Sequence, residues 1–186
     1  MPIFRKGQGR HTVAVAMAAV KMGDRFLQVG CSDATLLSAI ASKVGLSGRA
    51  CSIVESEADA DRARAGAAQS GTLLEVEVSP FSQIPHPDNS FDIIVVDSLK
   101  GLIASARPED RAAYLREARR VLVPRGRVVI IERVAQPGFA GLFSRQTVDP
   151  DYRASGGAAS TLRAEGFGAV RVLAERDGLL FVEGIR

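Results

Sequence analysis

The chain has 186 residues, of which 46% are hydrophobic and 24% are charged. This length suits one domain with one sizeable core and is too short for two full domains, while the ordinary composition argues against global disorder. The net charge of +3 is a mild excess that does not favour a nucleic-acid partner. The sequence shows no signal peptide and no apolar run of the roughly 18 to 20 residues that span a membrane, so a cytoplasmic location is expected.

The first elements alternate between helix and strand. Residues 1–22 are expected to form an N-terminal arm and a helix that begins near His11. Apolar runs predict strands and helical patterns predict helices in the order strand 25–30, helix 33–44, strand 50–55, helix 57–69, strand 73–78, strand 91–97, helix 108–121 and strand 128–132. The arginines of the 108–121 segment lie among Glu109, Asp110 and Glu117, a pattern typical of a solvated helix face.

The last elements predict a helix at 158–165 and two strands at 169–173 and 179–182. The Asp177-Gly178 pair between these strands is a strong signal for an antiparallel hairpin. Strands that alternate with helices favour a parallel sheet covered on both faces. The predicted fold is therefore α/β, with a doubly wound, mostly parallel seven-stranded sheet and an antiparallel C-terminal hairpin. No linker or internal repeat divides the chain, so residues 1–186 are expected to form a single domain.

The two cysteines are expected to be free thiols. Cys31 follows the first strand, whereas Cys51 lies near the start of the second strand. In neighbouring parallel strands these positions lie at opposite ends of the sheet, and a disulfide needs Cα atoms within about 7 Å. The sequence also shows no spacing of metal ligands, and no metal site is predicted.

Ligands of open α/β sheets bind at the carboxyl ends of the strands. The segments expected at this edge are 30–35, 55–57, 79–82 and 97–100. Gly30 permits a tight turn, and the helix that follows offers free N–H groups and a partial positive charge. Each feature alone has a purely structural explanation, such as a turn glycine or a solvated strand end. Their joint placement at consecutive strand ends favours a ligand site.

Five segments carry a family resemblance. They are, in chain order, GDRFLQVGCSDATLL, ACSIVESEADADRAR, IPHPDNSFDIIVVDSL, LREARRVLVPRGRVVIIE and LRAEGFGAVRVL. Together they resemble the successive motifs of class I S-adenosylmethionine-dependent methyltransferases, especially the small-molecule type related to quinone-biosynthesis enzymes. The resemblance covers about residues 20–186 and implies a Rossmann-like fold. It also implies S-adenosylmethionine as cofactor and S-adenosylhomocysteine as product.

The resemblance places the methionine part of the cofactor at the first motif. There Gly30, Cys31 and Ser32 would face it. Glu55, which ends the second strand, would hold the two ribose hydroxyls. Ser56 would lie beside the adenine ring.

The later motifs complete the implied site. Pro80 and Phe81 would lie at the adenine edge, with the Phe81 N–H available to a ring nitrogen. Asp97, Ser98 and Leu99 would line the path from the cofactor to the methyl acceptor. No residue is assigned a catalytic role, because methyl transfer from a sulfonium depends on positioning and desolvation more than on an acid or a base.

The chain departs from the family in its first motif. The family pattern is acid-x-Gly-x-Gly-x-Gly, whereas Gln28 replaces the acid and Ser32 and Ala34 replace two glycines. Asp33 adds a negative charge, which would repel the cofactor's carboxylate if the side chain pointed inward and which, as a helix cap, would compete with a ligand for the same N–H groups. Pro80 stands where the family usually has an adenine-binding Asp, at a cost of roughly 1 to 3 kcal/mol for the unpaired amino group.

Three functions remain open at this point. The first is methyl transfer to a small, partly apolar acceptor, and the second is a non-catalytic binding or partner-stabilising domain. A nicotinamide-dependent oxidoreductase ranks last, because the glycine turn lacks the dinucleotide fingerprint. His86 could act as a general base, but a structural role in a surface loop is favoured, and closure of His11 over the site is considered without being favoured. The N-terminal arm and segment 135–157 either roof the acceptor, or the segment is an irregular excursion folded against the edge of the domain. The sequence leaves open whether the chain forms a homodimer or binds a partner protein.

Overall fold

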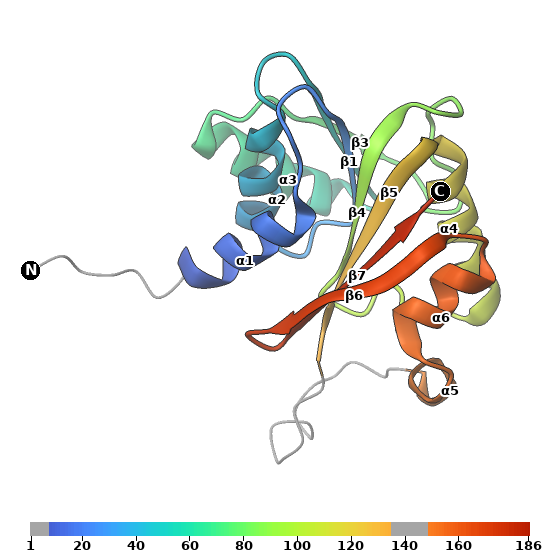
Figure 1. Ribbon diagram of the computed structural model, residues 1–186. Coiled ribbons are helices and arrows are strands. Elements are labelled where there is room, and N and C mark those ends of the chain that lie inside the picture. Colours follow the sequence, from blue (N-terminus) through green and yellow to red (C-terminus); the bar gives the residue numbers. More distant parts are fainter. Residues whose placement is uncertain (1–7, 135–148) are drawn as a thin grey trace, which may run out of the picture.

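A seven-stranded sheet organises the protein (Figure 1). The computed structural model describes residues 8–134 and 149–186. The strand order is β3-β2-β1-β4-β5-β7-β6, in which β1 to β5 pair in parallel and β7 runs antiparallel to both of its neighbours. The strands are β1 (Arg25–Val29), β2 (Arg49–Val54), β3 (Glu75–Val78), β4 (Phe91–Ser98), β5 (Leu122–Arg133), β6 (Gly168–Arg176) and β7 (Leu179–Ile185). The predicted fold class is confirmed.

Helices cover both faces of the sheet (Figure 1). They are α1 (Gln8–Ala18), α2 (Ala34–Ala41), α3 (Glu57–Ser70), α4 (Pro108–Val121), α5 (Pro150–Ala154) and α6 (Gly157–Ala164), with a short 3-10 helix η1 (Ser42–Val44) after α2. The first three α-helices pack on one face and the last three on the other. None of the helices in the described ranges is long and apolar enough to cross a membrane.

The central position of β4 in the sheet explains why the sequence of this strand is continuously apolar. Ile93 and Val95 belong to the cluster under α1, α2 and α3, whereas Ile94 and Val96 belong to the cluster under α4, α5 and α6. All four side chains are buried. A strand buried on both faces has no solvent side, so the usual alternation of polar and apolar residues is lost.

Local signals in the sequence form as predicted. Asp33 is the N-cap of α2 and accepts hydrogen bonds from two backbone N–H groups, and Ser56 caps α3 by accepting from one, that of Asp59. Asp177 and Gly178 both have positive φ, at 55° and 74°, as the tight turn of the C-terminal hairpin requires. The predicted free thiols are also confirmed, since Cys31 and Cys51 are both unbridged and buried.

The largest differences from the predicted boundaries are at the end of the first helix and the start of the fifth strand. The first helix was expected to continue to Met22, but it ends at Ala18 because Ala19 turns into the left-handed region with φ 47°. Strand β5 begins at Leu122, six residues before the predicted start, because Leu122 already pairs with Phe91. The expected turn at 124–126 is instead an irregularity within this long strand, with Arg125 at φ 65°.

A short helix was missed. Helix α5 lies inside the segment 135–157 that was expected to be irregular. Asp149 caps it by accepting from the N–H of Asp151, and Pro150 occupies its first turn, so the start signal was present in the sequence. Residues 135–148 lie outside the described part of the chain, and the expected roof over the acceptor therefore stays a prediction.

Candidate cofactor site

The turn after β1 is the tightest part of the carboxyl edge. Gly30 has φ 84°, a conformation that side-chain-bearing residues rarely adopt. A Cβ at this position would lie 3.0 Å from Cδ1 of Leu102 and 3.2 Å from the carbonyl oxygen of Asp97. The Gly30 N–H donates to the Ile53 carbonyl oxygen at 2.9 Å. The turn is therefore held between the ends of β2 and β4, and only glycine fits there.

Asp97 braces this turn from the end of β4. Its Oδ2 accepts from the Ser32 N–H at 2.7 Å, and its Oδ1 accepts from the Leu99 N–H at 3.1 Å. The side chain is buried, and burial raises the pKa of Asp97 against the lowering effect of these hydrogen bonds. Asp97, Ser32 and Leu99, which were predicted to belong to one site, thus lie together. The carboxylate binds the chain's own backbone.

Asp33 occupies the N-terminus of α2. Its Oδ1 accepts from the N–H groups of Thr35 and Leu36, at 2.9 and 3.1 Å. Its Oδ2 lies 3.1 Å from Nε2 of His11, which α1 brings to the turn. Burial raises the Asp33 pKa, but the hydrogen bonds from Leu36 and His11 outweigh it and hold the pKa below its usual range. His11, whose role at the site was not favoured from the sequence, therefore lies beside this turn, and its contact there is a carboxylate.

A buried amide lies beneath the same turn. Gln28 is 1% exposed, and its Nε2 donates to the Gly30 carbonyl oxygen at 3.0 Å. Its Oε1 is buried without a hydrogen-bond partner. An unpaired buried acceptor costs about 1 to 3 kcal/mol, so this amide is a local cost to stability beneath the turn.

The nucleoside end of the predicted site lies between β2 and the loop after β3. Glu55 is exposed, and its Oε1 accepts from the Phe81 N–H at 3.4 Å. The Phe81 ring packs edge-on against the ring of Tyr114, with centroids 5.7 Å apart. Burial and the nearby Glu55 charge raise the pKa of Tyr114. Pro80 is exposed and lies directly before Phe81 in the chain. This side of the predicted nucleoside site therefore comprises Glu55, Pro80, Phe81 and Tyr114.

Two further predicted residues have structural contacts. Ser56 accepts from the Asp59 N–H at 3.2 Å and donates to the Asp59 carboxylate at 2.8 Å. Cys31 is buried, and burial and the charge of Asp97 raise its pKa to about 11. The carbonyl oxygen of Cys31 accepts from Arg62 at 3.4 Å, a contact that the sequence did not suggest.

A buried polar cluster on the α4 side was missed by sequence reasoning. Ser98 is buried at the end of β4, where its Oγ accepts from the Ile103 N–H at 2.9 Å. Its register partner on β5 is Glu132, which accepts from the Tyr152 hydroxyl at 2.5 Å. Burial raises the pKa of Glu132 in spite of this hydrogen bond. The signal in the sequence was a lone acid at the end of an apolar strand.

Arg111 joins this cluster instead of lying on a solvated helix face. It is 6% exposed, and its guanidinium lies 4.4 Å from the centroid of the Tyr152 ring. It also donates to Asp149 at 2.9 Å and to the carbonyl oxygens of Ile103 and Ala106. These contacts fix α5 against α4. The interpretation of the arginines as uniformly solvated was therefore wrong for Arg111.

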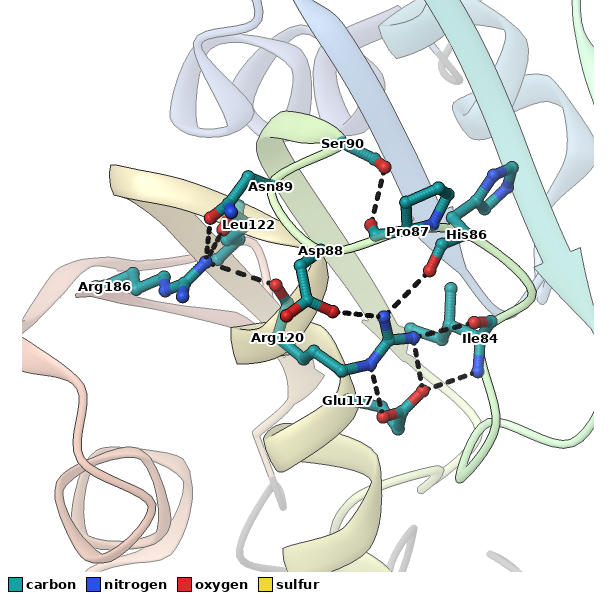
Figure 2. A network of polar contacts seen from close by, with 10 residues as sticks. All are labelled: Ile84, His86, Pro87, Asp88, Asn89, Ser90, Glu117, Arg120, Leu122 and Arg186. Carbon is teal, nitrogen blue, oxygen red and sulfur yellow. Dashed lines mark hydrogen bonds and ion pairs between the residues drawn. The ribbon is translucent and has the colours of Figure 1, made fainter.

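A second polar network belongs to the loop between β3 and β4 (Figure 2). Arg120 donates to Glu117 through two nitrogens, at 2.8 and 2.9 Å, and to Asp88 at 2.8 Å. It also donates to the carbonyl oxygens of Ile84 and His86. The surface beside it is a hollow of about 790 Å³. Because this guanidinium is already fully used within the chain, the network serves the loop and offers no charge to a ligand.

His86 packs beneath this loop. Its ring meets Phe91 edge-on, with centroids 4.9 Å apart, and Nε2 lies 3.1 Å from Oε1 of Glu77. The side chain is 7% exposed. These contacts favour the structural role over a catalytic one. In residues 8–134 and 149–186 no group of three metal-type side chains is close enough to hold an ion.

A family model described as "Methyltransferase domain" matches residues 27–130, which include the turn, Glu55 and Asp97. The chain belongs to the class I S-adenosylmethionine-dependent methyltransferases. The cofactor of this family is S-adenosylmethionine. The residues that the resemblance assigned to the cofactor lie at the carboxyl edge of the sheet, where open α/β sheets bind their ligands, and their contacts with the cofactor stay a prediction.

Individual methyltransferases are also similar to this chain in sequence or in fold. A 27-O-demethylrifamycin SV methyltransferase of Amycolatopsis mediterranei is 31% identical over 129 residues, which are 68% of this chain and 44% of that protein. A SAM-dependent methyltransferase from Aquifex aeolicus is 22% identical with a TM-score of 0.75, over 94% of this chain and 88% of that one. A methyltransferase of Haloferax volcanii, solved with the Trm112 activator, is 20% identical with a TM-score of 0.66, over 96% and 90%. This methyltransferase chain thus spans less than half the length of the Amycolatopsis mediterranei relative.

Proposed function

We propose that this chain transfers the methyl group of S-adenosylmethionine to a small, partly apolar acceptor. The observation that carries the proposal is Glu55, an exposed carboxylate at the end of β2 beside the Phe81 N–H. A carboxylate at this point accepts two hydrogen bonds from a ribose diol. Its neighbour in the sheet, the Gly30 turn, has the conformation that brings backbone close to a ligand.

The residues present fit the nucleoside end of the cofactor. Glu55 would hold the ribose, and Phe81 with Tyr114 would give the adenine an apolar wall. When bound, the cofactor supplies an electrophilic methyl group on a sulfonium. Asp97 keeps the turn fixed through its bonds to Ser32 and Leu99, so the protein contributes positioning and the exclusion of water.

The proposed acceptor class is supported by two features. The Amycolatopsis relative is named for methylation of a small molecule, 27-O-demethylrifamycin SV. In this chain, the segment that would roof the acceptor contains Pro137, Phe139, Leu142 and Phe143, which suit an apolar surface. We further propose that residues 1–186 act as one domain in the cytoplasm.

Calorimetric titration of the purified protein tests the cofactor. We expect S-adenosylmethionine and S-adenosylhomocysteine to bind with micromolar dissociation constants, and NAD not to bind. Glu55→Ala should weaken both about 10- to 100-fold, because charged hydrogen bonds contribute roughly 1.5 to 3 kcal/mol. The matched control is Glu175→Ala, which removes an exposed acid from β6 on the far side of the sheet. Absence of binding at millimolar ligand would overturn the proposal, and binding would justify a screen of acceptors.

A second candidate is a non-catalytic domain that stabilises a partner or a second copy of the chain. It is favoured because backbone donors of the first motif are occupied within the chain. The N–H groups of Ser32, Thr35 and Leu36 already donate to Asp97 and Asp33. The Haloferax volcanii structure is a complex between a methyltransferase activator and its methyltransferase partner. Failure of all cofactor titrations together with a stable dimer in sedimentation would support this candidate.

A further inference from the structure

We propose that the methyl acceptor of this chain carries a carboxylate, which Arg133 binds at the end of β5. The inference rests on the proposed function and narrows the acceptor to an amphipathic acid, with an apolar body and one anionic end. It stands on a group of three cations at the carboxyl edge of the sheet, Lys100, Arg133 and Arg176, and on the apolar residues beside them.

The guanidinium of Arg133 is held by the backbone of the predicted acceptor path. Arg133 is exposed, and its Nε donates to the Leu99 carbonyl oxygen at 3.1 Å. The Leu99 N–H is in turn bound by Asp97. Among the described residues, none accepts from Nη1 or Nη2 of Arg133. These two nitrogens present parallel N–H groups, which match the two oxygens of a carboxylate.

Two other cations accompany Arg133 at this edge. Arg133 lies opposite Leu179 of β7, which lies opposite Arg176 of β6, so the three residues form one row across neighbouring strands (Figure 1). Directly opposite residues of antiparallel strands point to the same face of a sheet. Leu179 belongs to the cluster under α1, α2 and α3, and both arginines therefore point to that face. Lys100 follows Leu99 in the chain and is exposed.

The three cations have no acidic partner in the part of the chain that the structure describes. None of the ion pairs between described residues includes Lys100, Arg133 or Arg176. The segments outside the described ranges, 1–7 and 135–148, contain no Asp and no Glu in their sequence. Cations that gather beside a predicted site without counter-charges favour an anionic ligand.

The acids of the carboxyl edge lie elsewhere. Asp33 and Asp97 are bound to backbone N–H groups of the turn after β1, on the cofactor side. Glu132 points to the opposite face of β5 and accepts a hydrogen bond there. Asp177 is exposed in the hairpin turn and offsets one of the three cations. The acceptor side of the edge therefore keeps a positive balance.

Apolar residues connect these cations to the cofactor turn. Cys31 of the turn, Leu99 and Leu179 belong to one cluster. They are buried, but 6%, 7% and 9% of their surfaces stay exposed, so their outer atoms reach the edge of the sheet. A ligand whose apolar part covers these atoms would bring an anionic end to Arg133. An amphipathic acid therefore matches both the apolar residues and the guanidinium.

The expected effect follows from the type of bond. Arg133→Gln removes the charge and the paired donors, so it should weaken binding of an acid about tenfold, which corresponds to about 1.4 kcal/mol. Arg133→Lys keeps the charge without the paired geometry and should weaken binding about threefold. Lys100→Gln and Arg176→Gln should each weaken binding only about twofold, because charges of exposed groups are screened by salt.

Two ligands of equal shape separate the anionic group from the apolar body. 2-Naphthoate carries a carboxylate on an apolar ring system, and 2-naphthamide carries a neutral amide in its place. We would titrate both into wild type, Arg133→Gln and Arg133→Lys, each with S-adenosylhomocysteine present, and follow the ligand signals by NMR. The matched control is Arg125→Gln, which removes an exposed arginine from the opposite end of β5. Each protein would also be titrated with S-adenosylhomocysteine alone and melted to verify its fold.

The expected result is specific to the carboxylate. 2-Naphthoate should bind wild type more tightly than 2-naphthamide does, Arg133→Gln should abolish this difference, and Arg125→Gln should preserve it. All the proteins should bind S-adenosylhomocysteine alike. Equal affinity of wild type for the two ligands, equal weakening by the two glutamine variants, or no binding of 2-naphthoate at millimolar concentration would overturn the inference and leave the proposed function intact. Failure of wild type to bind S-adenosylhomocysteine would overturn both.

Discussion

Replacement of Gly30 by alanine should destabilise the fold by a calculable amount. The positive φ of 84° alone costs a non-glycine residue about 1 kcal/mol or more. The added Cβ would also press on Leu102 Cδ1 at 3.0 Å and on the Asp97 carbonyl oxygen at 3.2 Å. The leucine end can rotate away, but the carbonyl belongs to the central strand β4 and cannot. Overpacking of this kind adds about 1 to 3 kcal/mol, so the total is about 2 to 4 kcal/mol.

Thermal unfolding followed by circular dichroism measures this cost. For a chain of this size, each kcal/mol shifts the melting temperature by about 2 to 4 °C, so Gly30→Ala should lower it by about 4 to 16 °C. The matched control is Gly71→Ala. Gly71 has φ 66°, and a Cβ there would meet nothing within 4 Å. The Gly71→Ala substitution therefore introduces the backbone strain without the steric contact, and it should lower the free energy of unfolding by about 1 kcal/mol.

The difference between the two variants isolates the contact at the turn. If Gly30→Ala costs no more than Gly71→Ala, the turn is not pressed against the end of β4, and the reasoning is refuted. If the loss is as expected, binding of S-adenosylhomocysteine to Gly30→Ala at low temperature should also weaken, because the turn must shift from its braced position.

Three further outcomes are expected. In the folded protein, Cys31 and Cys51 should react very slowly with a thiol reagent at pH 7.4, because pKa values of about 11 and about 12 leave well under one thiol group in a thousand as thiolate. After denaturation, both thiols should react fully. Tyr152→Phe should lower the free energy of unfolding in urea by about 1 to 3 kcal/mol at pH 7.5. This loss should shrink in acid. Burial raises the pKa of Glu132, so below that pKa the carboxyl group is neutral and accepts a weaker hydrogen bond from Tyr152 than the carboxylate does at pH 7.5. An equal loss at both pH values would contradict the assignment. Ser56→Ala should cost about 1 kcal/mol by the same assay, and an unchanged midpoint would exclude its capping role.

The sheet could be predicted because its signals are local. A strand buried on both faces must be apolar throughout, and an Asp-Gly pair between two strands permits few other turns. The start of β5 could not be predicted, because Leu122 joins the sheet through its pairing with Phe91, 31 positions away, and the local sequence Pro124-Arg125-Gly126 reads as a turn. Pairing over such distances leaves no periodic trace in the sequence.

The candidate site, like the sheet, was predictable where its signals are local and not where it depends on contacts between separate elements. The positions of Gly30 and Glu55 at strand ends followed from topology, and the cap of α2 was narrowed to Ser32 or Asp33, of which the structure has Asp33. The partner of Asp33 and the engagement of the Phe81 N–H with Glu55 were not predicted, since each depends on how two separate elements pack. Arg111 was misread for the same reason: its charge is satisfied by α5, an element that only the structure revealed.

The strand order has a consequence for synthesis on the ribosome. β7 inserts between β5 and β6, so the outer edge of β5 has no neighbour until residues 179–185 have been made. The nascent chain therefore exposes the apolar residues of an unpaired edge, among them Val129 and Ile131, while most of the domain is already outside the exit tunnel. Such a chain closes its sheet last, and it is most vulnerable to aggregation until β7 has been made.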